Sequence, residues 1–236
     1  MPCGVAIETS GKVGSVAVVE GRRVVAVERF PHGLRHAAEI VPILDRLIRG
    51  GGWGPKDIQN IYVSAGPGSF TGLRIGITVV KTMALAGGAK IVAVPTVRVL
   101  AANAPIDAKH VIIVLDAKRD QIFTARFERD GHEWVEREAA HLDSLTGMLG
   151  RSPRPVFLLG EGIPYHEKFV PKDDAGVIVT PADCWPARAE AVAEIGMGMA
   201  ERGEFADAFT LAPTYVRRPE AEEKSEEKRS SSGRGY

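Results

Sequence analysis

A glycine-rich segment at residues 65–76, which reads AGPGSFTGLRIG, is the stretch best suited to chemistry. It follows an apolar run at 61–64 and precedes small and apolar residues typical of a helix. Glycines let another backbone approach closely, and the start of a helix attracts anions. Two interpretations stay open, a phosphate site and a tight turn with close helix packing, although the spacing matches neither the dinucleotide nor the P-loop pattern. The motif comprises Gly66, Pro67, Gly68, Ser69, Phe70, Thr71 and Gly72.

Two carboxylates stand where a magnesium-bound nucleotide could be held. Glu8 ends the first apolar run of the chain, and Asp116 ends a similar run in its second half. Residues 10–15, which read SGKVGS, could cradle phosphate, although hairpins with two glycines are more often only turns. We therefore predict a vestigial nucleotide cleft. It is formed by Glu8, Thr9, Ser10, Gly14 and Asp116.

Histidines and cysteines give little support for a metal site. His32 and His36 are four residues apart and could share one helical face. However, Pro31 and Gly33 place His32 before the helix begins, and no third ligand is evident. The two cysteines of the chain are far apart and lack metal-ligand spacing. We predict no metal site, and we interpret His36 as a surface residue at a subunit contact.

The elements that position these residues alternate between strands and helices. Short apolar runs predict three strands at 5–7, 16–19 and 24–27. The period then becomes helical, and the rest of the first half is predicted as a helix at 35–48, a strand at 61–64, a helix at 70–86, a strand at 91–94 and a short helix from Pro95. The second half repeats this order, with strands at 111–115, 122–127, 133–138, 156–159 and 177–179 and helices at 142–149, near 165 and at 187–202.

This order predicts the actin-like ATPase (ASKHA, ribonuclease H-like) fold, an α/β architecture in which two related α/β domains face each other across a nucleotide site. We expect one domain at 1–105, with 206–217 packing back on it, and a second, smaller domain at 106–205. Residues 219–236 are charged and then rich in serine and glycine, so they cannot offset their ordering entropy by burial. They predict a disordered tail.

Composition narrows the classes of function. Thirty basic residues balance thirty acidic ones, so the chain lacks the overall field of an autonomous nucleic-acid binder. A carboxylate at Glu8 interrupts the first apolar run before a signal peptide could develop, and no stretch reaches about 18 apolar residues. We therefore expect a cytoplasmic protein without membrane contact.

Several segments together resemble the TsaB (YeaZ) family, which serves the synthesis of threonylcarbamoyladenosine (t6A) on tRNA. The glycine segment is similar to the signature of that family, and so are 7–10 (IETS), 115–119 (LDAKR) and 213–217 (PTYVR). The likeness covers residues 5 to 217 and is weakest between 130 and 205. Glu8 is a departure, because family members usually carry aspartate there, and the longer side chain makes tight magnesium geometry less favourable.

The resemblance implies a non-catalytic subunit. It would bind and activate the related catalytic subunit TsaD, together with the ATPase TsaE, for t6A formation at adenosine 37 of tRNAs that read ANN codons. In TsaD, metal-binding histidines begin the helix whose counterpart here is 95–100 (PTVRVL), which has no histidine or carboxylate. The resemblance also implies no cofactor of its own, ATP or its hydrolysis products at the complex interface, tRNA contact through the complex, and a homodimer when the chain is alone.

By the same resemblance, the helices at 35–49 and 70–86 form the partner surface, while one face of each covers the chain's own sheet. The predicted interface residues are His36, Glu39, Ile40, Ile43, Leu73, Arg74, Ile77 and Val80. A rival interpretation is a small-molecule kinase of the same fold, which needs an intact phosphate cradle and a general-base aspartate. Asp116 could serve as that base, but no second motif supports this interpretation.

Overall fold

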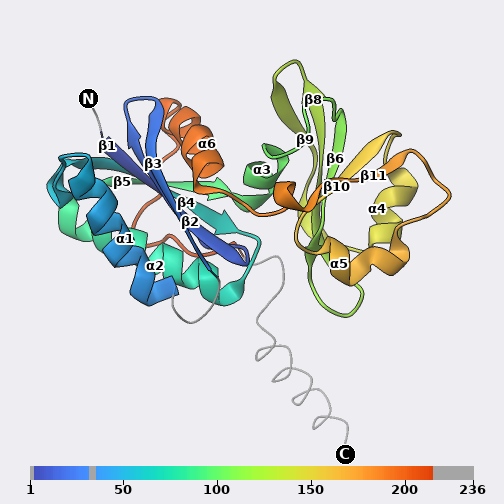
Figure 1. The fold of residues 1–236 in the computed structure, drawn as a ribbon, viewed down its shortest axis with the longest axis horizontal. Coiled ribbons are helices and arrows are strands. Elements are labelled where there is room, and N and C mark those ends of the chain that lie inside the picture. The colour runs from blue at the N-terminus through green and yellow to red at the C-terminus, as the bar shows by residue number, and fades with distance from the viewer. Residues whose placement is uncertain (1–2, 32–35, 215–236) are drawn as a thin grey trace, which may run out of the picture.

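The chain forms two α/β halves that lie side by side (Figure 1). The computed structural model describes residues 3–31 and 36–214. The predictions for His32, for 215–217 and for the tail at 219–236 fall outside the described residues, and so does the side chain of His36.

The first half is built on a five-stranded sheet in the order β3-β2-β1-β4-β5. β1 pairs antiparallel with β2 and parallel with β4, so a hairpin meander is continued by parallel strands. The sheet is covered on both faces, which explains why β1 is buried along its whole length and reads as a continuous apolar run. The elements are β1 (Cys3–Glu8), β2 (Val13–Glu20), β3 (Arg23–Pro31), α1 (His36–Gly50), η1 (Pro55–Asp57), β4 (Ile58–Gly66), α2 (Phe70–Gly87), β5 (Lys90–Pro95) and α3 (Thr96–Ala101).

The second half repeats this topology. Its first strand is interrupted at Val114, so β6 and β7 both pair with β8. Read as β9-β8-β6-β10-β11, the second sheet has the same order and the same antiparallel and parallel neighbours as the first. The repeat of element order predicted from the sequence is therefore a repeat of topology. The elements are β6 (His110–Ile113), β7 (Leu115–Asp116), β8 (Ile122–Asp130), β9 (Glu133–Asp143), α4 (Leu145–Arg151), β10 (Val156–Leu159), α5 (Ile163–His166), η2 (Glu167–Phe169), β11 (Val177–Val179), η3 (Ala182–Cys184) and α6 (Ala189–Glu201).

Alternation along β1 divides the core of the first half between two layers. Val5 and Ile7 belong to the cluster that includes the inner residues of α1 and α2. Ala6 points to the opposite face, into a cluster that includes α6. The small residues of α6 allow close contact there, because a Cβ atom at Gly196 would lie only 2.5 Å from the ring of Tyr62. The sheet is thus sandwiched between α1 and α2 on one side and α6 on the other.

The two halves share one hydrophobic core around α3 and α6. Figure 1 shows α3 between the two halves. The cluster that contains Ala6 and Val92 of the first sheet also contains Val111 and Phe127 of the second. α6 lies within the stretch expected to form the second domain, yet it contacts all five strands of the first sheet. After it, residues 206–214 return to the first half, where the amide of Ala206 donates to the Ile91 carbonyl at 2.8 Å.

The helix predicted at 142–149 begins later than expected. β9 continues to Asp143, and α4 starts only at Leu145, because the Ser144 side chain accepts a hydrogen bond from the amide of Gly147 and caps the helix there. Leu142 therefore lies in a strand that pairs with Phe123 of β8. The apolar period at 142–149 did not distinguish the last strand residues from the first helical turn.

Candidate partner interface and interdomain cleft

The third and fourth glycines of the glycine segment lie against the end of β1. A Cβ atom at Gly72 would be 1.9 Å from the carbonyl oxygen of Thr9, and one at Gly76 would be 2.4 Å from the Thr9 hydroxyl oxygen. Real Cβ atoms essentially never come that close to another heavy atom. Both glycines are therefore needed for α2 to pack against Thr9.

The first two glycines of the segment contact the backbone of two other parts of the chain, at Thr214 and at Ser10. At Gly66, whose φ angle is +116°, a Cβ atom would be 2.6 Å from the carbonyl oxygen of Thr214. At Gly68 it would be 2.6 Å from the carbonyl oxygen of Ser10, which accepts a hydrogen bond from the amide of Ser69 at 2.7 Å. The segment is thus the place where β1, its hairpin and the returning chain at 206–214 meet.

The first N–H groups of α2 are satisfied from within the segment. The Ser69 side chain accepts from the amide of Gly72 at 3.2 Å, and its carbonyl accepts from the amide of Leu73 at 2.9 Å. Of the two interpretations of the motif, this geometry favours the tight turn with close helix packing. The space that a phosphate cradle would need is occupied by the protein's own backbone.

Glu8 is fully buried at the end of β1. Its Oε1 atom accepts from the amide of Ser10 at 2.5 Å and from the Ser10 hydroxyl at 2.6 Å, and its Oε2 atom accepts from the hydroxyl of Ser64. Burial raises the pKa of Glu8, although the hydrogen bonds from the two serines oppose this rise. Both carboxylate oxygens are therefore engaged by the protein.

Asp116 is held within the second half. Its Oδ1 atom accepts from the amide of Lys118 at 3.1 Å and lies 3.1 Å from Nε2 of the buried His166. Partial burial works to raise the pKa of Asp116, but the hydrogen bonds from Lys118 and His166 outweigh it and lower the pKa. Lys118 is the first of three consecutive residues with positive φ, at 118–120, which form a left-handed turn between β7 and β8. Each carboxylate of the predicted cleft is therefore bonded inside its own half.

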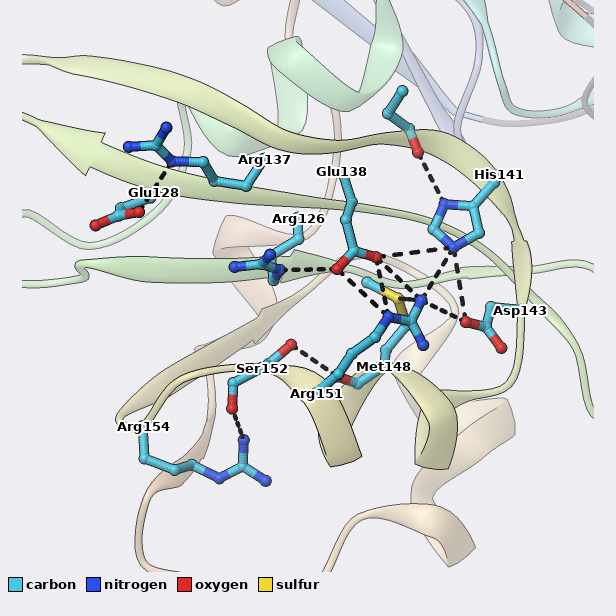
Figure 2. Close-up of polar contacts among 11 residues, drawn as sticks. Arg126, Glu128, Arg137, Glu138, His141, Asp143, Met148, Arg151, Ser152 and Arg154 are labelled. Carbon is cyan, nitrogen blue, oxygen red and sulfur yellow. Dashed lines mark hydrogen bonds and ion pairs between the residues drawn. The ribbon is translucent and has the colours of Figure 1, made fainter.

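A polar network in the second half ties β9 to α4 (Figure 2). The Arg151 guanidinium donates to Glu138 at 3.0 Å and to Asp143 at 2.5 Å. It also lies 3.2 Å from Nε2 of His141, whose Nδ1 atom is 2.8 Å from the Ala139 carbonyl oxygen. Because that carbonyl can only accept, Nδ1 carries a hydrogen and donates to it. Within residues 3–31 and 36–214, no group of three histidine, cysteine, aspartate or glutamate side chains could hold a metal ion.

Most of the predicted interface residues face inward. Within the described chain they are buried against the first sheet, with exposed fractions of 5% or less. These buried residues are Ile40, Ile43, Leu73, Ile77 and Val80. Glu39 is half-buried and Arg74 is exposed, with its guanidinium 3.8 Å from the centre of the Phe70 ring. The outer surface of α1 and α2 is therefore formed mainly by residues other than those singled out.

Three large apolar side chains of α1 and α2 are exposed. Leu85 is 56% exposed, and so is Val41 on the neighbouring α1, while Phe70 is 39% exposed. α2 is the one helix in the described part of the chain with the length and hydropathy of a membrane span, a property shared by core helices of soluble proteins. Only 33% of it is buried, however. Large apolar side chains exposed on two neighbouring helices make this side of the first half the candidate for partner binding.

The two sheets of repeated topology define an actin-like α/β protein. The solved structure of YeaZ from Pseudomonas aeruginosa superposes with a TM-score of 0.76 at 24% identity, over 91% of this chain and 100% of that one. The predicted fold class is therefore confirmed.

Sequence comparison gives the family. A family model described as TsaD, tRNA N6-adenosine threonylcarbamoyltransferase, matches residues 33–172. The tRNA threonylcarbamoyladenosine biosynthesis protein TsaB of Bacillus subtilis is 31% identical over 224 residues, which cover 93% of this chain and 96% of that protein. TsaB of Escherichia coli is 31% identical over 128 residues, 53% of this chain and 54% of that protein. The chain belongs to the TsaB (YeaZ) family and takes part in t6A biosynthesis on tRNA.

Sequence reasoning missed the residues that span the cleft. Glu161 accepts a hydrogen bond from the amide of Lys12 at 2.9 Å, and the Lys12 ammonium lies 4.9 Å from the centre of the Tyr165 ring. The available signal was a glutamate between Gly160 and Gly162, directly after the buried strand at 156–159. Paired glycines at the end of a buried strand indicate close backbone contact, which fixes the residue between them.

Proposed function

We propose that this chain is a non-catalytic subunit that binds and activates a TsaD-type threonylcarbamoyltransferase, together with a TsaE-type ATPase. The observation that carries the proposal is the exposure of three large apolar side chains on α1 and α2, which are Val41, Phe70 and Leu85. A surface of this kind is stable in water when a matching apolar surface covers it. The catalytic subunit has the same fold by family membership, so its equivalent helices are the natural match.

The proposed absence of catalysis in this chain is supported by the hydrogen bonds that its two candidate carboxylates already make. Both oxygens of the Glu8 carboxylate accept from Ser10 or Ser64, and Asp116 is bonded to Lys118 and His166. A magnesium-handling carboxylate needs free lone pairs directed at the ion. We therefore assign the chemistry at adenosine 37 to the partner, and ATP or its hydrolysis products would bind at the interface of the complex.

The remaining parts of the proposal follow from the same surface. Net charge is zero, so tRNA would be contacted through the complex. In the absence of the catalytic subunit, the same apolar surface would pair with a second copy of the chain, and the protein would act in the cytoplasm.

The test is reconstitution of t6A formation on unmodified tRNA with purified TsaD-type and TsaE-type proteins, with each component omitted in turn. Leu85→Glu and Val41→Glu place charges on the outer surface, and we expect each to reduce co-purification with the catalytic subunit by at least about tenfold. Ile106→Glu is the matched control, because Ile106 is 85% exposed on the loop between α3 and β6, away from both helices.

The outcomes separate the proposal from its rival. Loss of t6A formation by the two helix variants, with unchanged melting temperatures and an active control, supports a partner surface. If Leu85→Glu and Val41→Glu bind the catalytic subunit as well as the unmodified chain does, the surface is assigned to the wrong place. Phosphorylation of a small molecule by this chain alone, abolished by Asp116→Asn, would instead favour a kinase.

A further inference from the structure

One carboxylate forms a hydrogen bond between the two halves, apart from the shared apolar core. Glu161, in the second half, accepts from the backbone amide of Lys12 in the hairpin between β1 and β2, at 2.9 Å. The two residues are 149 positions apart in the chain. A Cβ atom at Gly11 would lie 3.0 Å from the same carboxylate oxygen, so the absence of a side chain at that position makes room for Glu161.

Glu161 projects from a rigid base. At Gly160, where φ is +134°, a Cβ atom would be 2.4 Å from the carbonyl oxygen of Val114, and at Gly162 it would be 2.6 Å from the amide nitrogen of Asp116. The amide of Gly162 also donates to the Val114 carbonyl at 3.0 Å. The backbone on both sides of Glu161 is therefore fixed to the break between β6 and β7, and only the side chain reaches across the cleft.

A second side chain of the same segment supports the contact. The exposed ring of Tyr165 has the Lys12 ammonium 4.9 Å from its centre and the Lys118 ammonium 5.7 Å from it. Lys12 belongs to the first hairpin and Lys118 to the corresponding turn of the second half. Residues 160–166 therefore contact both of the turns that border the cleft, one in each half.

We propose that residues 160–166 restrain the two halves of this chain in the observed arrangement, with the Glu161 carboxylate accepting from the Lys12 amide, a hairpin donor that an anionic ligand could otherwise use. The shared apolar core around α3 and α6 forms the permanent connection between the halves. The Glu161 contact is a single charge-assisted hydrogen bond close to solvent, so it restrains this arrangement without making it permanent.

The first measurement is hydrogen exchange at the Lys12 amide, followed by NMR in the full chain. Glu161→Ala removes the acceptor, and we expect exchange at this amide to become about tenfold faster, as a charge-assisted hydrogen bond of ordinary strength implies. Glu161→Gln keeps an oxygen acceptor and should retain most of the protection. Glu167→Ala is the matched control, because Glu167 is an exposed glutamate six residues further on.

A distance measurement reports the arrangement of the halves themselves. Spin labels at Lys56→Cys and Lys172→Cys, in a Cys184→Ala background, place one probe on an exposed position of each half. We expect a broader distance distribution in Glu161→Ala than in the unmodified chain. Gly11→Ala should act in the same direction, because its Cβ atom would displace the carboxylate.

The proposal is overturned if Glu161→Ala and Gly11→Ala leave both the Lys12 exchange rate and the distance distribution unchanged. It is also overturned if Glu167→Ala alters them as much as Glu161→Ala does, because the effect would then be one of general charge. Neither readout depends on t6A formation, so the outcome is independent of the proposed partner.

Discussion

Alanine substitutions in α2 test whether the glycines of the segment are required for α2 to pack against Thr9. At Gly76 the added Cβ atom would lie 2.4 Å from the Thr9 hydroxyl oxygen, and at Gly72 it would lie 1.9 Å from the Thr9 carbonyl oxygen. Adding a methyl group to an already packed contact lowers the free energy of unfolding by about 1–3 kcal/mol. Replacing glycine by alanine within a helix raises it by about 0.5–1 kcal/mol. We expect Gly76→Ala to be destabilising by about 1–2 kcal/mol and Gly72→Ala by about 2 kcal/mol or more.

A double substitution makes the prediction specific. Thr9→Ala removes the hydroxyl that meets the Cβ atom at Gly76 and leaves the Thr9 Cβ atom 3.7 Å away, an ordinary contact distance. That hydroxyl is buried without a hydrogen-bond partner among the described residues, so its removal breaks no such bond. Thr9→Ala should therefore rescue Gly76→Ala by about 1–2 kcal/mol. It should not rescue Gly72→Ala, because the backbone carbonyl remains.

Urea unfolding at constant pH, followed by circular dichroism, measures these free energies. Gly87→Ala is the control on the same helix, because its Cβ atom would meet nothing nearer than 3.5 Å, and it should be neutral or slightly stabilising. The packing argument fails if Gly76→Ala is as stable as the unmodified chain. It also fails if Thr9→Ala rescues Gly72→Ala to the same extent as Gly76→Ala.

Two predictions concern charge. Burial raises the pKa of Glu8 above its ordinary 4.5, so the stability that its protonated form gives is complete below pH 4.5 and declines as the pH rises toward the folded-state pKa. The free energy of unfolding of Glu8→Gln, measured relative to the unmodified chain, should therefore rise between pH 5 and pH 8. The rise should be about 1.4 kcal/mol for each unit by which the pKa of Glu8 in the folded state exceeds that in the unfolded state. The same difference between the two proteins at pH 5 and pH 8 would contradict this. Burial opposes the lowered pKa values of Glu138 and Asp143, but the hydrogen bonds from Arg151 outweigh it. Arg151→Met should cost about 1 kcal/mol at pH 7 and less as acid protonates both carboxylates, and a pH-independent cost would refute the role of the ion pairs.

Local patterns in the sequence were sufficient to predict the fold, because each half contains its own apolar runs in the same order. The apolar runs at 5–7 and 111–115 are strands buried on both faces, and the order of elements after them is the order of strands in each sheet. The period alone did not place the boundary at Ser144, where a side-chain cap ends the strand and begins the helix. A single capping hydrogen bond decided a boundary that hydrophobicity left open.

The candidate site was harder to predict, because it depends on contacts between distant segments. Glu161 forms a hydrogen bond with the Lys12 amide of the other half, yet no local sequence pattern around either residue predicts this contact. The same limit applies to α2, where the helical period identified Leu73 and Ile77 as one apolar face but could not say whether the sheet or a partner covers it. Burial assigns that face to the sheet and leaves Leu85 on the outside.

The two faces of α2 therefore carry different constraints, and this makes the proposed partner surface separable from the fold. The inner face requires glycine at 72 and 76 for contact with Thr9, so substitutions there should lower the unfolding free energy and, through it, partner binding. On the outer face, Leu85 is 56% exposed, so Leu85→Glu should lower partner binding with little change in stability. If both classes of variant lost stability to the same extent, the outer face would belong to the core of the chain, and the apolar surface would need no partner to explain it.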